Sequence, residues 1–173
     1  MKAIYLTGFM GAGKTTIGKR LSEALQVPVI DTDLYIEEKI GKKIADIFTE
    51  DGEQVFRKYE REYLRLLPNR DVVITTGGGI VIQEENRRWM MNNGHVIFLY
   101  CDIETIFDRV KTDPTRPLFD AVHKENTRRL YNQRMSFYNE AHFILDTTSK
   151  SFDDIVNSIL LWLRSEQGGN NNY

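Results

Sequence analysis

The stretch Gly8–Thr15, GFMGAGKT, constrains the fold of this 173-residue chain more than any other. It satisfies the pattern G-x-x-x-x-G-K-[ST], follows the apolar run Ala3–Thr7, and precedes a helical pattern in which Ile17 and Leu21 share a face. Glycines let the backbone curl so that successive N–H groups point inward, and the start of a helix adds positive partial charge. The stretch therefore predicts a strand, a phosphate-binding loop and a helix in direct succession.

Further apolar runs, separated by helical patterns, predict a layered α/β fold. The additional predicted strands are Pro28–Asp31, Val72–Thr76, Val96–Tyr100 and Phe143–Leu145. Apolar helix faces are formed by Val55, Tyr59, Tyr63 and Leu66, and by Phe152, Ile155, Val156, Ile159, Leu160 and Leu163. Strands that alternate with helices through right-handed crossovers form a parallel sheet covered on both faces. We expect a single domain over residues 1–165.

Two segments depart from this alternation. Residues 111–123, KTDPTRPLFDAVH, contain two prolines and few core positions, so we expect a lid. Residues 166–173, EQGGNNNY, are rich in glycine and asparagine, and we expect a disordered tail.

The composition is ordinary for a soluble globular protein. The net charge is −2, which favours neither nucleic acid nor a membrane as a partner. The one cysteine, Cys101, excludes an intrachain disulfide framework, and no apolar run is long enough to span a bilayer. We expect a monomeric, cytoplasmic protein.

The loop residues predict a nucleoside triphosphate and magnesium as ligands. Lys14 can reach the β- and γ-phosphates, and the Thr15 hydroxyl can ligate Mg²⁺. The alternative is a glycine-rich turn that only connects strand to helix. The full motif in its strand–loop–helix context favours the phosphate-binding interpretation. The candidate nucleotide-binding residues of the loop are Gly11, Ala12, Gly13, Lys14, Thr15 and Thr16.

The remaining motifs favour a kinase over other nucleotide-binding classes. A GTP switch protein would carry N-K-x-D, which is absent, and the strand VVITT ends in Gly77–Gly79 rather than in an acid. Asp31, at the end of its predicted strand, is therefore our candidate for the second magnesium-directing group. Asp102 occupies a similar position, but we interpret it as the N-cap of the following helix.

Two stretches suggest an acceptor site. In Asp31-Thr32-Asp33 the alternate carboxylates can face one site at a strand end, one toward magnesium and one toward an acceptor hydroxyl. Helix capping is the alternative explanation of Asp33. Three glycines at Gly77–Gly79 indicate a close approach or unusual dihedral angles, either for a ligand nest or for a tight turn.

Arginines predict that the acceptor is anionic. Arg57 and Glu60 lie three apart on a predicted helix, so Glu60 can hold the Arg57 fork for a carboxylate; a surface ion pair is the alternative. Arg134 is a second candidate fork. Arg116, in the predicted lid, can offset charge on the transferring group.

Taken together, the motifs resemble those of the shikimate kinase family over nearly the whole chain. They are GFMGAGKTT, DTD after the second strand, FRKYE at Phe56–Glu60, TGGG at Thr76–Gly79, RPL at Arg116–Leu118, and Arg134 with Tyr138. The resemblance implies a P-loop kinase fold, a three-layer α/β/α sandwich with a five-stranded parallel sheet of order 2-3-1-4-5. It also implies transfer of the ATP γ-phosphate to the 3-hydroxyl of shikimate, in aromatic amino-acid biosynthesis.

The same resemblance assigns roles. Asp33 would bind the ring hydroxyls and act as or near the base, within a substrate-binding region at about residues 31–61. Lys14 and Arg116 would stabilise the transferring phosphoryl group, and Arg109 would stack near adenine. Magnesium would be organised by Thr15 and Asp31. Shikimate would be held by Asp33, Arg57, Arg134 and the backbone of Gly77, Gly78 and Gly79.

Without the resemblance, the residues predict a small-molecule kinase whose acceptor is anionic and carries a hydroxyl group. A gluconate kinase, a nucleoside monophosphate kinase and a nucleotide-binding regulator without an acceptor are the rival hypotheses. Whether Asp33 removes the acceptor proton or only orients the hydroxyl stays open.

Overall fold

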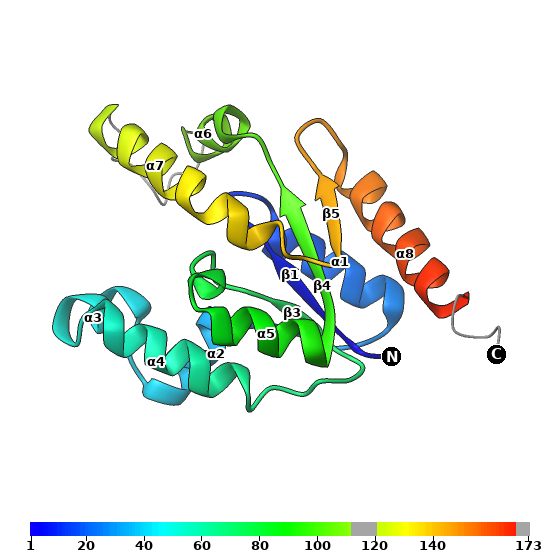
Figure 1. Ribbon diagram of the computed structural model, residues 1–173, viewed down its shortest axis with the longest axis horizontal. Helices are drawn as coiled ribbons and strands as arrows, with labels where there is room; N and C mark the ends of the chain where they lie inside the picture. The colour runs from blue at the N-terminus through cyan, green and yellow to red at the C-terminus, as the bar shows by residue number, and fades with distance from the viewer. Residues whose placement is uncertain (112–120, 169–173) are drawn as a thin grey trace.

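The computed structural model describes residues 1–111 and 121–168, and this part of the chain contains one five-stranded sheet in which all pairs are parallel. The strands are β1 (Ala3–Thr7), β2 (Val29–Asp31), β3 (Val73–Thr75), β4 (Gly94–Tyr100) and β5 (Phe143–Asp146). Their order is β2-β3-β1-β4-β5 (Figure 1). Both the predicted strands and the predicted order are confirmed.

Helices cover both faces of this sheet, so the predicted three-layer sandwich is confirmed (Figure 1). The helices are α1 (Lys14–Leu25), α2 (Thr32–Ile40), α3 (Ile44–Glu50), α4 (Glu53–Leu64), the 3-10 turn η1 (Ile80–Ile82), α5 (Glu84–Asn93), α6 (Ile103–Lys111), α7 (Ala121–Tyr138) and α8 (Phe152–Gly168). Successive strand residues point to opposite faces. Leu6 packs with α1 and α8, whereas Tyr5 packs with residues of α4 to α7.

The segment α2–α4 forms a small unit with its own apolar cluster beside the β2 end of the sheet. Ile36, Ile47 and Phe56, one from each helix, are buried against one another. The buried residues of α4 are Phe56, Glu60 and Leu64, which differ from the predicted face, and Leu66 lies two residues beyond the helix and is 67% exposed. Glu60 can lie inside because it is paired with Arg57.

The predicted boundaries of the tail and of the lid agree only partly with the structure. α8 continues to Gly168, so residues 166–168 are helical and the expected tail begins later than predicted. Residues 169–173 lie outside the described residues. The predicted lid, 111–123, overlaps the end of α6 and the start of α7. Its remainder, residues 112–120, lies outside the described part of the chain.

Two smaller predictions about the sequence are tested directly. Asp102 is the N-cap of α6, since its Oδ2 accepts from the backbone N–H of Glu104 at 2.9 Å and of Thr105 at 3.2 Å. Within the described residues, no helix has both the length and the apolar character needed to cross a bilayer.

Candidate active site

The loop between β1 and α1 has the curled backbone that its glycines predict. Gly8, Gly11 and Gly13 have φ angles of 150°, 77° and 90°, a region that residues with a side chain rarely adopt. Gly8 also lies against β4, because a Cβ there would be 2.7 Å from the carbonyl oxygen of Leu99. The loop therefore depends on glycine both for its dihedral angles and for its contact with the sheet.

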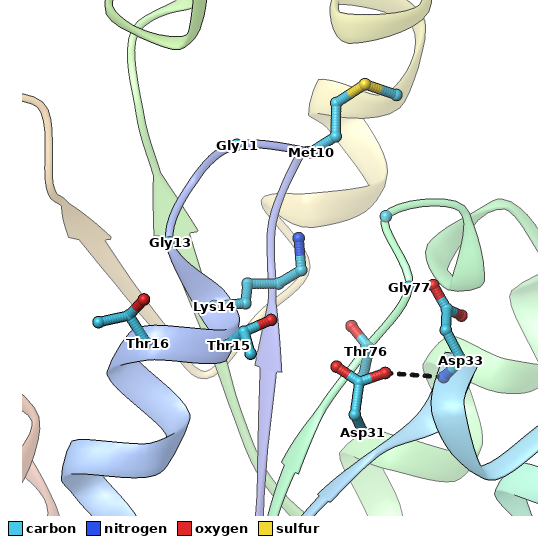
Figure 2. A pocket seen from close by; sticks show the side chains of 11 residues that line it. Met10, Gly11, Gly13, Lys14, Thr15, Thr16, Asp31, Asp33, Thr76 and Gly77 are labelled. Atoms are coloured by element: carbon cyan, nitrogen blue, oxygen red, sulfur yellow. Dashed lines mark hydrogen bonds between the residues drawn. The ribbon is translucent and has the colours of Figure 1, made fainter. Parts of the chain in front are cut away.

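The Lys14 ammonium is directed back over this loop. It donates to the carbonyl oxygens of Gly8 at 2.7 Å and Phe9 at 2.9 Å, and Figure 2 shows it beside the loop, on the side that faces Gly77 and Asp33. Thr15 and Thr16 follow on the first turn of α1. A cavity of about 450 Å³ opens here, and we call it the phosphate cavity. It is lined by Met10, Gly11, Gly13, Lys14, Thr15, Thr16, Asp31, Asp33, Thr76, Gly77 and Gly78.

Asp31 ends β2 and caps α2. Its Oδ1 accepts from the backbone N–H groups of Asp33 at 3.0 Å and Leu34 at 3.2 Å, and its Oδ2 accepts from the Thr75 hydroxyl at 2.8 Å. The capping role that the sequence left open for Asp33 thus belongs to Asp31. Of the roughly four acceptor positions on a carboxylate, three are used, so Oδ2 can accept one more hydrogen bond.

Asp33 is aimed at the cavity instead. Its Oδ1 is buried and has no hydrogen-bond partner among the described residues, which is costly for a carboxylate. Burial raises the pKa of Asp33 to about 6, assisted by the nearby Asp31 carboxylate and opposed by Lys14 and Arg57. A carboxylate with a pKa this close to neutrality and an unused acceptor oxygen is suited to accept a proton or a hydroxyl hydrogen bond.

Two of the three glycines, Gly77 and Gly79, leave room for side chains of the site that lie close to their backbone. A Cβ on Gly77 would meet the Asp33 carboxylate, and a Cβ on Gly79 would meet the Arg57 guanidinium. Gly79 has an ordinary φ of −92°, so close approach, and not an unusual dihedral angle, requires glycine there. Of the two predicted reasons for these glycines, close approach is therefore the one observed at Gly77 and Gly79.

Arg57 on α4 is held between two glutamates. Nη1 donates to Glu60 Oε2 at 2.5 Å, while Nε and Nη2 donate to Glu53 Oε1 at 3.2 and 3.0 Å. Glu60 is 1% exposed, and burial raises its pKa to about 7 against the opposing effect of Arg57. The predicted pair of Arg57 with Glu60 is confirmed, and it is a buried pair rather than a surface one.

These residues line a second cavity of about 450 Å³, which we call the acceptor cavity. It is lined by Met10, Asp33, Ile44, Phe48, Glu53, Phe56, Arg57, Glu60, Gly77, Gly78, Gly79, Leu130 and Arg134. α7 supplies Arg134, whose guanidinium lies 5.8 Å from the centre of the Phe9 ring, and Tyr138, whose hydroxyl donates to the Gly78 carbonyl at 2.5 Å. Two guanidinium groups and an apolar wall suit a small anionic molecule with a carbon ring.

The two cavities adjoin. Met10, Asp33, Gly77 and Gly78 line both of them. Figure 2 shows Asp33 opposite the loop, with Gly77 beside it and the Lys14 ammonium between the loop and these residues. The arrangement can place a terminal phosphate from the loop side in line with a hydroxyl beside Asp33.

Most of the predicted site residues meet in this cleft, with three exceptions. Ala12 is 1% exposed and packs into the core, and its N–H donates to the Phe9 carbonyl at 3.2 Å. Arg109 lies at the outer edge of the loop, where Nη1 donates to the Gly11 carbonyl at 3.3 Å. Arg116 lies outside the described residues.

Several lining residues were missed by the sequence reasoning. Met10, Ile44, Phe48 and Leu130 have no polar motif to mark them, and their role depends on packing around the cavity. Thr75 hydrogen-bonds Asp31, and the Thr32 hydroxyl accepts from the Gly77 N–H at 3.0 Å. Thr75 and Thr76, at the end of β3, were the one available signal, because a hydroxyl at the carboxyl end of a parallel strand lies near the ligand edge.

Comparisons with known proteins agree on one family. The family model described as shikimate kinase matches residues 10–164. The shikimate kinase of Bacillus cereus (strain G9842) is 54% identical over 159 residues, covering 92% of this chain and 96% of that relative.

Among solved structures, the shikimate kinase of Acinetobacter baumannii in complex with shikimate superposes with a TM-score of 0.88 at 36% identity. The match covers 96% of this chain and 94% of that one. A gluconokinase from Sinorhizobium meliloti has a TM-score of 0.65 at 15% identity, a likeness that extends to the fold alone.

Proposed function

The chain belongs to the shikimate kinase family, an enzyme family that transfers the γ-phosphate of ATP to the 3-hydroxyl of shikimate, and we propose which of its residues carry out that transfer. The products are ADP and shikimate 3-phosphate, in the pathway to the aromatic amino acids. The observation that carries the assignment of roles is that Asp33 lines both cavities.

On the donor side, the loop amides and Lys14 bind the β- and γ-phosphates of ATP. Lys14 exchanges its hydrogen bonds with the loop carbonyls for bonds to phosphate oxygens. Arg109, at the loop edge, lies near the adenine. We propose that Arg116 joins Lys14 in offsetting the charge of the transferring group.

Magnesium fits the residues at the floor of the phosphate cavity. The Thr15 hydroxyl and the free position on Asp31 Oδ2 are oxygen donors, the kind that Mg²⁺ prefers. Thr15 would bind the ion and Asp31 would accept from one of its waters. When bound, magnesium would supply positive charge that offsets the negative charge of the phosphates.

On the acceptor side, Arg57 and Arg134 grip the carboxylate of shikimate. Arg57 uses three of its five N–H donors on Glu53 and Glu60, which fixes the plane of the fork and leaves two for the ligand. The backbone of Gly77–Gly79 lies against the other edge of the ring. A solved relative from Acinetobacter baumannii binds shikimate, which supports this occupant.

Asp33 receives the 3-hydroxyl. Its carboxylate, which lines both cavities, accepts the hydroxyl hydrogen bond, and its raised pKa lets it take the proton as the oxygen–phosphorus bond forms. Lys14 and Arg57, the two cations whose charge opposes the rise, keep it ionised near neutral pH.

For the whole molecule we propose a monomer that acts in the cytoplasm, without nucleic acid or membrane as a partner. The net charge of −2 supports the last part of this proposal, because it provides no basic field for nucleic acid or an anionic membrane.

The function is tested by following ADP formation with a coupled assay, offering shikimate, gluconate, AMP or no acceptor in turn, with magnesium present or chelated. We expect turnover with shikimate only, and none after chelation. Equal ADP formation without any acceptor would refute the kinase assignment. Preference for gluconate or AMP would refute the acceptor.

A further inference from the structure

The turn η1, which follows the tri-glycine, is held through its carbonyl groups by two side chains of α5. Asn86 Nδ2 donates to the Ile80 carbonyl at 3.2 Å. Arg87 Nη1 donates to the carbonyls of Val81 at 2.8 Å and Ile82 at 3.3 Å. Asn86 is fully buried, and the Arg87 side chain is only 11% exposed. All three carbonyls of η1 therefore accept from α5.

Arg87 also binds the end of α7. Its Nε donates to Glu140 Oε2 at 2.7 Å, two residues beyond the last residue of the helix. Its guanidinium lies 4.5 Å from the centre of the Phe137 ring, which belongs to the last turn of α7. Because an arginine fork is planar and rigid, one side chain fixes η1 and α7 relative to each other.

These two elements position two parts of the acceptor-cavity lining. η1 continues directly from Gly79, and α7 supplies Arg134. At the cavity itself the walls are joined by the hydrogen bond from Tyr138 to the Gly78 carbonyl. Behind it, Val81, Arg87, Phe137 and Tyr138 surround a void of only about 10 Å³. Packing this close transmits a displacement of Arg87 to both walls rather than absorbing it.

We propose that Arg87 is a positioning residue for the acceptor: by joining η1 to α7 it sets the separation between the Gly77–Gly79 backbone and Arg134. The inference rests on the proposed function of the acceptor cavity. A gap of the wrong width weakens the grip on shikimate. The phosphate loop touches α7 through Phe9, whose ring centre lies 5.3 Å from that of Tyr131, but its residues Gly11–Thr15 belong to the loop and the start of α1, so we expect the ATP site to change less. Arg87 does not touch the reacting groups.

The competing explanation is an ion pair that only stabilises the fold. The two differ in kinetics. A stability role lowers the fraction of folded enzyme and hence the apparent kcat, while the KM values of the folded molecules stay unchanged. A positioning role raises the KM for shikimate and leaves the KM for ATP as it was.

The test is steady-state kinetics of Arg87→Met, which keeps much of the aliphatic stem against Phe137 but removes the fork. We expect a rise of about tenfold in the shikimate KM, since small misplacements in a site have effects of this order or larger, with the ATP KM within about twofold. Arg87→Lys should be intermediate, because one ammonium cannot satisfy both elements. The control is Arg88→Met, which removes the neighbouring arginine, 76% exposed and paired with Glu84, and should change neither KM.

Glu140→Gln loosens only the α7 branch of the contact and is made at a half-exposed side chain, so it decides the matter if Arg87→Met does not fold. It should raise the shikimate KM less than Arg87→Met does, in the same direction. An unchanged shikimate KM in these folded variants, an equal rise in both KM values, or the same effect from Arg88→Met would overturn the inference. Failure of the unaltered enzyme to phosphorylate shikimate would instead refute the proposed function.

Discussion

Replacing Gly79 with alanine tests the geometry of the acceptor cavity through one added carbon. The new Cβ would overlap the Arg57 guanidinium, and the backbone at Gly79 can accept alanine because its φ is −92°. Arg57 cannot retreat freely, since it is hydrogen-bonded to Glu53 and to the buried Glu60. The expected result is a displaced fork and a weakened hold on the substrate carboxylate.

The expected size of the effect follows from the hydrogen bonds that the Arg57 guanidinium supplies to the substrate carboxylate. A hydrogen bond to a charged group contributes about 1.5–3 kcal/mol, so losing one raises the shikimate KM by roughly 10- to 150-fold. Disturbing the buried Glu60 pair should also lower the free energy of unfolding by about 1–3 kcal/mol, which thermal denaturation measures. Initial-rate assays with each substrate varied in turn should show the ATP KM nearly unchanged.

A double-mutant cycle identifies the cause. In an Arg57→Ala background, Gly79→Ala should add little, because the group it displaces is already gone. Gly78→Ala is the matched comparison: a Cβ there is 3.5 Å or more from its neighbours, so a smaller effect is expected. Additive effects of Gly79→Ala and Arg57→Ala, or an equal effect of Gly78→Ala, would refute the reasoning.

Three further predictions concern titrating groups. Asp33→Asn should lower kcat by about 100-fold or more while ADP still binds, as calorimetry can measure; retained turnover would exclude Asp33 as the base. Because the folded pKa of Asp33 is about 6, kcat/KM for shikimate should fall as the pH drops below about 6; a profile flat to pH 5 would contradict this. His142 Nδ1 accepts from the Val96 N–H at 3.0 Å, and burial lowers the pKa of His142, so the unfolded chain binds its proton more readily. The free energy of unfolding should therefore decrease as the pH falls below about 6.5, and His142→Gln should weaken that dependence in denaturant titrations; an unaltered pH dependence would contradict the assignment.

The raised pKa of Asp33 also implies a conflict between stability and catalysis. A carboxyl with a pKa of about 6 in the fold and 3.8 outside it favours folding only while protonated, and that contribution is lost as the pH rises through about 6. At neutral pH the ionised group costs on the order of 1–3 kcal/mol. Asp33→Asn should thus be more stable than the unaltered enzyme at pH 7, although less active.

The strand, loop and helix around Gly8–Thr15 and the layered α/β arrangement could be predicted from local sequence patterns. Positive φ at Gly11 and Gly13, the helix that begins at Lys14, and β-branched runs all act over a few residues, so the sequence carries them. The strand order was predicted from the resemblance to the family, because the order of the strands along the chain does not reveal which of them are neighbours in the sheet.

Local sequence patterns predicted the wrong buried residues where a charged side chain is buried and an apolar one is exposed. The sequence predicted that Leu66 would share the buried face of α4, yet Leu66 lies beyond the end of this helix and is 67% exposed, whereas Glu60 on the helix is buried. Likewise the reason for glycine at Gly77 and Gly79 lies in Asp33 and Arg57, residues more than twenty positions away.

By itself, then, the sequence determined that this chain binds a nucleotide phosphate in a parallel α/β sheet, because backbone conformation and amphipathic periodicity are properties of neighbouring residues. Only the tertiary structure decided that Asp33 is desolvated, that Arg57 is clamped against a buried Glu60, and that Arg134 faces both of them. Desolvation and close contact depend on which distant segments exclude water together, and that is settled only when the whole chain has packed.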